Sequence, residues 1–337
     1  MTFALSAGIA TSIGSLPHTD ADEAAALVLA RHPELPAAPQ LPNRTRREGM
    51  IAQAAHGIPG VDVLDDGTLR ADSDRVQSAM ADGVPVDGSI RPEEAAGLLA
   101  FLEQARGRSA LIKVQLTGPV TLGLALARAG VPCRVAFTLA GEAVHARSRA
   151  MLDEVARRVP GSGVVAFLDE PSLSVIEHPG FPLAPYAVVD LLASALSGFR
   201  SAAATGVHCC GPSDWRAVID AGPDILSFPV VLAGSVHTAA LGSFLERGGW
   251  VAWGAVPTDA PVSDDAGFLW RRLVAVWCDM VRAGCPSTLL RERALVTPAC
   301  GLAGHGPTQA DRVLSLTAEL GNRAREQASG RRLTIGA

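Results

Sequence analysis

Three side chains that commonly bind metal ions follow two apolar segments of the 337-residue chain. His208 and Cys210 lie two residues apart at the end of segment 205–208, and Cys300 follows segment 295–297. Alternate residues of a strand face the same side, so His208 and Cys210 can chelate one ion together. Imidazole and thiolate are typical Zn²⁺ ligands, and three protein ligands with one exchangeable position are typical of catalytic zinc. The spacing predicts an open zinc site. The alternative is that these are ordinary buried residues.

Polar groups that could contact a substrate follow two other apolar segments. Asp169 and Glu170 end the run 164–168 and precede Pro171, which stops the strand. Neighbouring strand residues face opposite ways, so only one of the two carboxylates is expected to point inward, where it could bind an ammonium group or act as a base. Ser15 offers a hydroxyl to a ligand carboxylate. Helix capping, ion pairing and turn chemistry are the structural alternatives.

An alternation of short β-branched runs and Ala/Leu-rich stretches must position these groups, and it indicates βα units with a parallel sheet. The predicted strands are 10–14, 110–116, 163–168, 205–208, 225–228, 250–255 and 295–297. The predicted helices are 21–31, 92–105, 136–158, 185–203, 214–221, 236–247, 264–283 and 309–328.

This number of units predicts one α/β domain over residues 1–337 with a (β/α)8 TIM-barrel fold, in which the ends of the strands meet at one mouth. An irregular excursion is expected at about 35–90, with a hairpin around 61–69 because Asp66-Gly67 is a turn signal. No Gly-x-Gly-x-x-Gly follows the first predicted strand, which counts against a dinucleotide-binding fold.

Composition excludes several classes of protein. Hydrophobic residues make up 48% of the chain and charged residues 19%, which is typical of a globular protein. A net charge of −5 without long basic runs indicates neither a nucleic acid nor a membrane surface as partner. Six cysteines without an export signal predict reduced thiols and a cytoplasmic location.

Five segments, taken in order, resemble the catalytic barrel of cobalamin-independent methionine synthases and their relatives, whose barrel is shared with uroporphyrinogen decarboxylases. The segments are TSIGSLP (11–17), QLTGPVTL (115–122), LDEP (168–171), HCCG (208–211) and TPACGL (297–302). The resemblance implies a zinc-dependent methyltransferase of methionine biosynthesis, with a (β/α)8 fold, in which a zinc-bound thiolate attacks a methyl group.

Residue roles follow from the same resemblance. It implies that His208, Cys210 and Cys300 bind zinc, and that Ser15 and Asp169 contact the amino-acid group of homocysteine. Methyl donors of the family and its relatives are a methylfolate or a methylcorrinoid protein. The chain has room for one barrel, whereas full-length enzymes of this family have two, so the donor stays open.

The sequence also departs from the family pattern. Pro229 stands where the family has a glutamate zinc ligand, and Asp259 stands where a relative has a histidine near the folate. The substrate-binding glutamate of the early loop is not matched, and Glu48 is its candidate replacement. Glu170, Asp259 or water is the candidate fourth ligand.

Three functions therefore remain open. The first is methyl transfer to a thiol such as homocysteine. The second keeps the same barrel with other chemistry, either thiol alkylation of the coenzyme M type or decarboxylation. The third is a non-catalytic amino-acid-binding barrel.

Overall fold

Six parallel strands form the central sheet of the protein. The computed structural model describes residues 5–108, 110–262 and 265–330. The strands are paired in chain order, from β3 to β8, and each is almost wholly buried. Their bounds are β3 (Ile112–Thr117), β4 (Val164–Asp169), β5 (Ala203–His208), β6 (Ile225–Pro229), β7 (Trp250–Val256) and β8 (Ala294–Pro298). All six lie within two residues of the predicted bounds, because continuous apolar runs are typical of strands covered on both faces.

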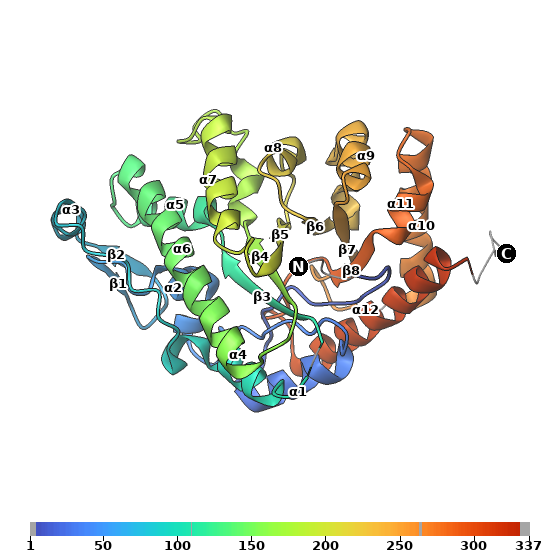
Figure 1. The fold of residues 1–337 in the computed structure, drawn as a ribbon, viewed down its shortest axis with the longest axis horizontal. Coiled ribbons are helices and arrows are strands. Elements are labelled where there is room, and N and C mark those ends of the chain that lie inside the picture. Colours follow the sequence, from blue (N-terminus) through green and yellow to red (C-terminus); the bar gives the residue numbers. More distant parts are fainter. Residues whose placement is uncertain (1–4, 109, 263–264, 331–337) are drawn as a thin grey trace.

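The prediction of an eight-stranded TIM barrel is wrong. The sheet has six strands and curls into a half-barrel (Figure 1). Segment 10–14, which was predicted to be a strand, forms only an isolated bridge between Ala10 and Val296. Segment 36–40 likewise forms isolated bridges, one of Ala37 with Lys113 and one of Gln40 with Ser15.

Local sequence explains why these two segments form no regular ladder: prolines interrupt segment 36–40, and a glycine bends segment 10–14. Pro36, Pro39 and Pro42 have no N–H to donate, so hydrogen bonding along this stretch is interrupted every third residue. Gly14 has a φ of 147°, and a Cβ at this position would lie 2.3 Å from the Gln115 amide nitrogen. The first segment therefore bends around Gln115, and Ser15 follows directly after that bend.

Helices flank the sheet, with α5 to α11 along the outer side of its arc and α1, α4 and α12 at the other end of the molecule (Figure 1). Their bounds are α1 (Ala21–Arg31), α2 (Met50–Ala55), α3 (Ser73–Ala81), α4 (Pro92–Gln104), α5 (Pro119–Arg128), α6 (Cys133–Arg158), α7 (Pro185–Ser197), α8 (Trp215–Asp220), α9 (Thr238–Glu246), α10 (Ala266–Arg282), α11 (Ser287–Glu292) and α12 (Pro307–Ala328). The 3₁₀ helices are η1 (Arg46–Glu48), η2 (Pro171–Val175) and η3 (Val230–Ser235).

Most predicted helices agree with these bounds, and the differences have local causes. The prediction 185–203 is too long, because the chain turns at Gly198 and Ala203 already begins β5. Asp264, the predicted start of the helix 264–283, lies outside the described residues; α10 begins at Ala266 after the capping residue Asp265. Helices α2, α3, α5 and α11 were not predicted.

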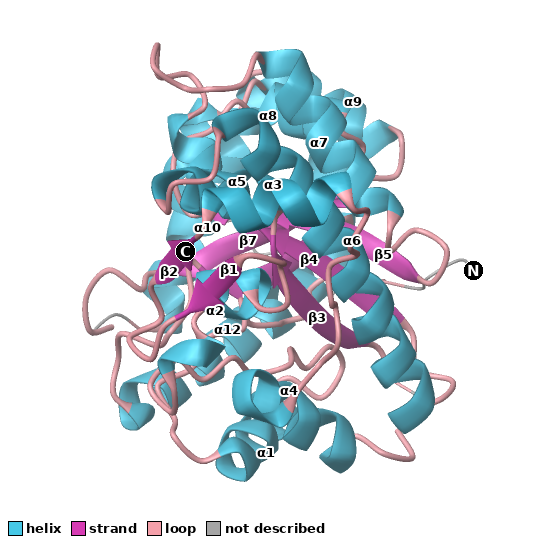
Figure 2. Ribbon diagram, turned by 90° about the vertical axis from the view of Figure 1, so that its left-hand side faces the viewer, coloured by secondary structure: helices cyan, strands magenta, loops and turns pink. Residues whose placement is uncertain are grey.

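The excursion between the first helix and α4 contains the predicted hairpin. Strands β1 (Val61–Val63) and β2 (Leu69–Ala71) pair antiparallel, and Gly67 in the turn has a φ of 82°. This confirms the hairpin expected from Asp66-Gly67. Figure 2 shows the two-stranded sheet beside the main sheet, with helices on either side.

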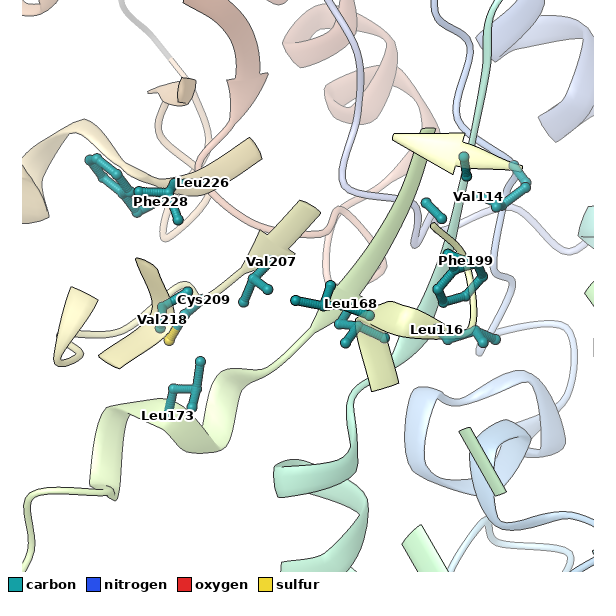
Figure 3. Packing of buried hydrophobic residues seen from close by; sticks show 14 of the residues in the cluster. Val114, Leu116, Leu168, Leu173, Phe199, Val207, Cys209, Val218, Leu226 and Phe228 are labelled. Carbon is teal, nitrogen blue, oxygen red and sulfur yellow. The ribbon is translucent and has the colours of Figure 1, made fainter. Parts of the chain in front are cut away.

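Two apolar clusters, one on each face, hold the sheet. The smaller cluster lies inside the curl and includes Val165 and Phe167 of β4, together with Leu295 of β8. The larger cluster packs the outer face against the helices, and Figure 3 shows Val207, Cys209 and Leu226 within it. Because side chains alternate along β5, His208 faces the inside of the curl while Val207 and Cys209 face the helices. Within the described residues, no helix combines the length and the apolar character that crossing a membrane would need.

Candidate metal centre

His208, Cys210 and Cys300 converge at the carboxyl ends of the strands. Their ligand atoms, one nitrogen and two sulfurs, all lie within 4.8 Å of one another. His208 is the last residue of β5, and Cys300 follows β8 by two residues. These strands are not neighbours in the sheet, so only its curl brings the ligands together. The three predicted ligands therefore form one cluster.

The imidazole of His208 is prepared to bind a metal through one nitrogen. Its Nδ1 lies 3.0 Å from Ser227 Oγ, and its Nε2 is buried without a hydrogen-bond partner among the described residues. Burial, assisted by the positive charge of Lys113, lowers the pKa of His208 to about 3, so the ring is neutral. A proton on Nδ1, donated to Ser227, leaves the Nε2 lone pair available to a metal ion, as in sites where a neighbouring group fixes the tautomer.

The two cysteines contact each other and are partly accessible. A hydrogen bond from the Cys300 thiol lowers the pKa of Cys210 to about 6, and the same contact raises the pKa of Cys300. Two sulfurs bound at about 2.3 Å to a tetrahedral ion lie about 3.8 Å apart, so a set of ligand atoms within 4.8 Å needs little movement. One neutral imidazole and two thiols that can ionise fit Zn²⁺ well.

Cys209 lies between His208 and Cys210 in the sequence but does not belong to the metal centre. It is fully buried in the helix-side cluster, and burial raises its pKa to about 12. Because side chains alternate along the strand, His208 and Cys210 face the other side, and the Cys209 thiol is left buried and unreactive among the helices.

Asp169 lies at the end of β4, beside His208 in the register of the sheet. Its Oδ1 is buried and has no hydrogen-bond partner among the described residues. Burial raises the pKa of Asp169 to about 7, and the positive charge of Lys113 opposes this rise. An unpartnered carboxylate oxygen that borders a cavity can accept a hydrogen bond from a ligand cation.

Lys113 supplies a buried positive charge below this carboxylate, and sequence reasoning missed it. Its Nζ donates to the carbonyl of Ile13 at 2.6 Å and to Gln115 Oε1 at 3.1 Å, and it lies 4.8 Å from the centre of the Phe167 ring. Burial lowers its pKa to about 8. The signal in the sequence was a single lysine within the otherwise uncharged strand 112–117.

Ser227 is the second residue that sequence reasoning missed. It pairs with His208 in the register between β5 and β6, and it orients the imidazole. The only signal was one hydroxyl within the apolar strand Ile225–Pro229, and this signal does not reveal which side chain the hydroxyl contacts.

Glu170 has a structural position rather than one facing the metal centre. Its carboxylate accepts hydrogen bonds from the N–H groups of Val120 (2.8 Å) and Thr121 (2.7 Å) and from Thr121 Oγ1 (2.6 Å). These donors belong to the first turn of α5, where the helix dipole also stabilises a negative charge. Of the candidates for a fourth metal ligand, Glu170 is thus engaged elsewhere, so the strand-end pair Asp169 and Glu170 divides as alternation predicts.

A cavity of about 350 Å³, here called the first cavity, joins the cysteines to the predicted substrate residues. Its lining includes Ser15, Glu48, Asp169, Cys210 and Cys300. The structure therefore brings all of the candidate substrate-binding and metal-binding residues to a single cavity.

Close packing positions Ser15 in this cavity. A Cβ added to Gly301 would lie 2.0 Å from Ser15 Oγ, so glycine is required for the hydroxyl to lie where it does. The Ser15 carbonyl also accepts the N–H of Leu302 at 2.8 Å. The loop after β8 thus carries a ligand cysteine and fixes the serine at the same time.

The Glu48 carboxylate is hydrogen-bonded to residues that are close to it in the sequence. Its Oε1 accepts from Arg44 at 2.8 Å, and its Oε2 accepts from the N–H of Leu41 at 3.2 Å. Burial raises the pKa of Glu48, and the Arg44 charge counteracts this effect. The carboxylate lines the first cavity, but it is already paired there.

Pro229 and Asp259 line a second cavity, of about 360 Å³, on the other side of the cysteines. Pro229 ends β6 and offers no side-chain ligand. Asp259 is exposed and is not part of the metal-ligand cluster among the described residues. Among the described residues, this centre therefore offers three ligand atoms to a metal ion.

Comparison with known proteins supports the fold alone. No family model matches the chain, and no curated protein sequence matches it. Among solved structures, the chain is similar to a protein provisionally named as the vitamin-B12 independent methionine synthase of Listeria monocytogenes. The identity is 13%, the TM-score is 0.57, and the match covers 90% of this chain and 86% of that one. A designed cube-shaped, porous protein cage matches with 12% identity over 72% of this chain and 73% of that one, at a TM-score of 0.30, which carries no argument.

Proposed function

We propose that this protein is a zinc-dependent methyltransferase whose acceptor is a thiol, with homocysteine as the acceptor that fits best. The observation that carries the proposal is the cluster of one His208 ring nitrogen, Cys210 Sγ and Cys300 Sγ, which lie within 4.8 Å of one another beside a cavity with an unpartnered carboxylate. The structural similarity to a protein named as a methionine synthase agrees with this chemistry.

The first cavity supplies contacts for the amino-acid part of such a thiol. The Asp169 carboxylate, with a free Oδ1, accepts a hydrogen bond from the ammonium group, and the Ser15 hydroxyl donates to the carboxylate. Lys113 lies beneath and favours the ionised form of Asp169 through its charge. The thiol of the substrate then lies toward Cys210 and Cys300.

His208, Cys210 and Cys300 would hold the zinc ion. When it is bound, zinc lowers the pKa of a coordinated thiol, so that the thiol reacts as a thiolate at neutral pH. In the reaction, the new carbon–sulfur bond forms on the methyl carbon while the bond from that carbon to the donor breaks. The electron pair leaves with the donor.

Zinc content and homocysteine binding test this proposal in two steps. We expect about one zinc per chain by elemental analysis, and loss of zinc in Cys210→Ser. The matched control is Cys209→Ser, because Cys209 is adjacent but faces the helices. A zinc-free protein, or equal zinc content in both variants, would refute the metal centre.

The acceptor is tested on the zinc-loaded protein by calorimetry. We expect homocysteine to bind, and Asp169→Asn to weaken binding of homocysteine more than binding of 4-mercaptobutyrate, which lacks the ammonium group. Methylfolate and a methylcorrinoid protein are then offered as methyl donors. If homocysteine binds tightly but no methyl donor is turned over, including small alkyl donors, the result would support a non-catalytic binding protein instead.

A further inference from the structure

Two separate cavities have the same pair of cysteines in their linings. Among the described residues, the first cavity, with Ser15 and Asp169, and the second cavity, with Pro229 and Asp259, share only Cys210 and Cys300 in their linings. The first is built by the N-terminal segments and the ends of β4 and β5. The second is built by the ends of β6 and β7, by η3 and by α10. A nucleophile held in one cavity can therefore meet an electrophile held in the other at a single point.

The wall of the second cavity is mostly apolar near the cysteines. Apolar groups of Pro229, Val230, Ala255 and Ala299 line it, and no strand-end acid or amide of the described residues reaches into this part. An apolar wall excludes water and accepts an uncharged alkyl group, which is the part of a donor that must approach the sulfur.

Two charged residues belong to the same lining. Arg272 of α10 is half-buried and forms no ion pair with any residue that the structure describes, whereas Asp259 is exposed. A half-buried guanidinium without an acidic partner is a natural site for a carboxylate or another anion, because it presents several donors in a fixed plane. Among the described lining residues, Asp259 is the one carboxylate, and its charge opposes an anion.

We propose that the second cavity binds a compact alkyl donor that carries an anionic group, with this group at Arg272 and the transferable alkyl group facing Cys210 and Cys300. This inference rests on the proposed function and adds the chemical class of the donor. A cavity of about 360 Å³ lies near the lower end of the usual range for small-molecule sites, so the donor is expected to be small. The balance needs no further reactant: the alkyl carbon gains a bond to the acceptor sulfur and loses its bond to the leaving group, which departs with the electron pair.

Two alkylating reagents of nearly equal size test the charge preference directly. Iodoacetate is anionic and iodoacetamide is neutral. In the full chain stripped of metal, the acceptor is the protein's own cysteine: a carbon–sulfur bond forms and iodide leaves. Rates at Cys210 and Cys300 are measured for each reagent by mass spectrometry, and the exposed Cys133 serves as the internal reference.

We expect the iodoacetate-to-iodoacetamide rate ratio at the paired cysteines to fall about fivefold in Arg272→Gln, a size typical of one partly buried charge contact. Arg271→Gln is the matched control, because Arg271 is the adjacent, exposed residue of the same helix, and its ratio should not change. The ratio at Cys133 should be the same in all three proteins. An unchanged ratio in Arg272→Gln would overturn the proposal.

A binding measurement separates the two cavities. On the zinc-loaded chain, homocysteine affinity should be unchanged in Arg272→Gln, since Arg272 lies outside the first cavity. Loss of homocysteine binding in this variant would overturn the assignment of the cavities. The alkylation test uses neither zinc nor homocysteine, so a protein that lacks zinc but shows the Arg272 effect would refute the proposed function and leave the anion preference standing.

Discussion

His32 gives the protein a dependence of stability on pH that can be calculated from its surroundings. It ends α1 and is only 1% exposed, with Nε2 at 3.1 Å from the carbonyl of Leu314 in α12. Its Nδ1 is buried without a partner among the described residues. The ring thus joins the first helix, which follows the Ser15 segment, to the last helix. We expect His32→Gln, which keeps a donor for Leu314, to remove this pH dependence.

The sign and the size of this pH dependence follow from the linkage between protonation of His32 and folding. Burial lowers the pKa of His32 from an ordinary 6.5 to about 4, so the unfolded chain binds the proton more tightly than the folded chain does. The stabilisation is therefore complete above pH 6.5 and is lost as the pH falls toward 4. The pKa of His32 thus differs by about 2.5 between the unfolded and folded states. At about 1.36 kcal/mol for each pKa unit, this corresponds to a loss of about 3 kcal/mol in the free energy of unfolding.

Urea unfolding at several pH values between 7.5 and 4 measures this loss. The wild-type protein should lose about 3 kcal/mol more than His32→Gln over that interval. The control is His237→Gln, because His237 is exposed and makes no side-chain hydrogen bond at the start of α9. Parallel pH profiles for the wild-type protein and His32→Gln would show that His32 is protonated in the folded state as easily as in the unfolded state, which would refute the reasoning.

Three other substitutions test how the site is held. Glu170→Ala leaves the α5 donors Val120 N–H and Thr121 N–H unpaired and should lower the free energy of unfolding by about 3 kcal/mol in urea titration, whereas an unchanged value would refute the capping role. Gly301→Ala, whose Cβ would meet Ser15 Oγ at 2.0 Å, should weaken homocysteine binding in calorimetry while zinc content stays constant. An unchanged affinity would refute the contact between Ser15 and homocysteine. Lys113→Met removes the donor to the carbonyl of Ile13 and should cost about 2 kcal/mol of stability in urea titration, with Lys113→Arg as the conservative comparison.

The strands and the His208–Cys210 pair could be predicted from the sequence because both depend on local pattern. Buried parallel strands are continuous apolar runs, and all six strands of the main sheet were predicted within two residues. The alternation along β5 is sufficient to separate His208 and Cys210 from Cys209. The number of strands was overestimated, because an apolar segment such as 10–14 reads as a strand whether or not a partner segment can supply the hydrogen bonds.

The sequence by itself determined which residue types stand at the ends of the strands, and hence a candidate set of metal-binding residues with a nearby carboxylate. Only the tertiary structure decided what surrounds them. Lys113 and Asp169 are 56 positions apart and interact because β3 and β4 pair in the sheet. Cys210 and Cys300 are 90 positions apart, follow strands that are not neighbours, and meet only because the sheet curls. The same curl divides the space around the sulfurs into two cavities, one bordered by Ser15 and Asp169 and the other leading to Arg272. Cavities are formed by side chains from many elements, and no local pattern encodes their walls.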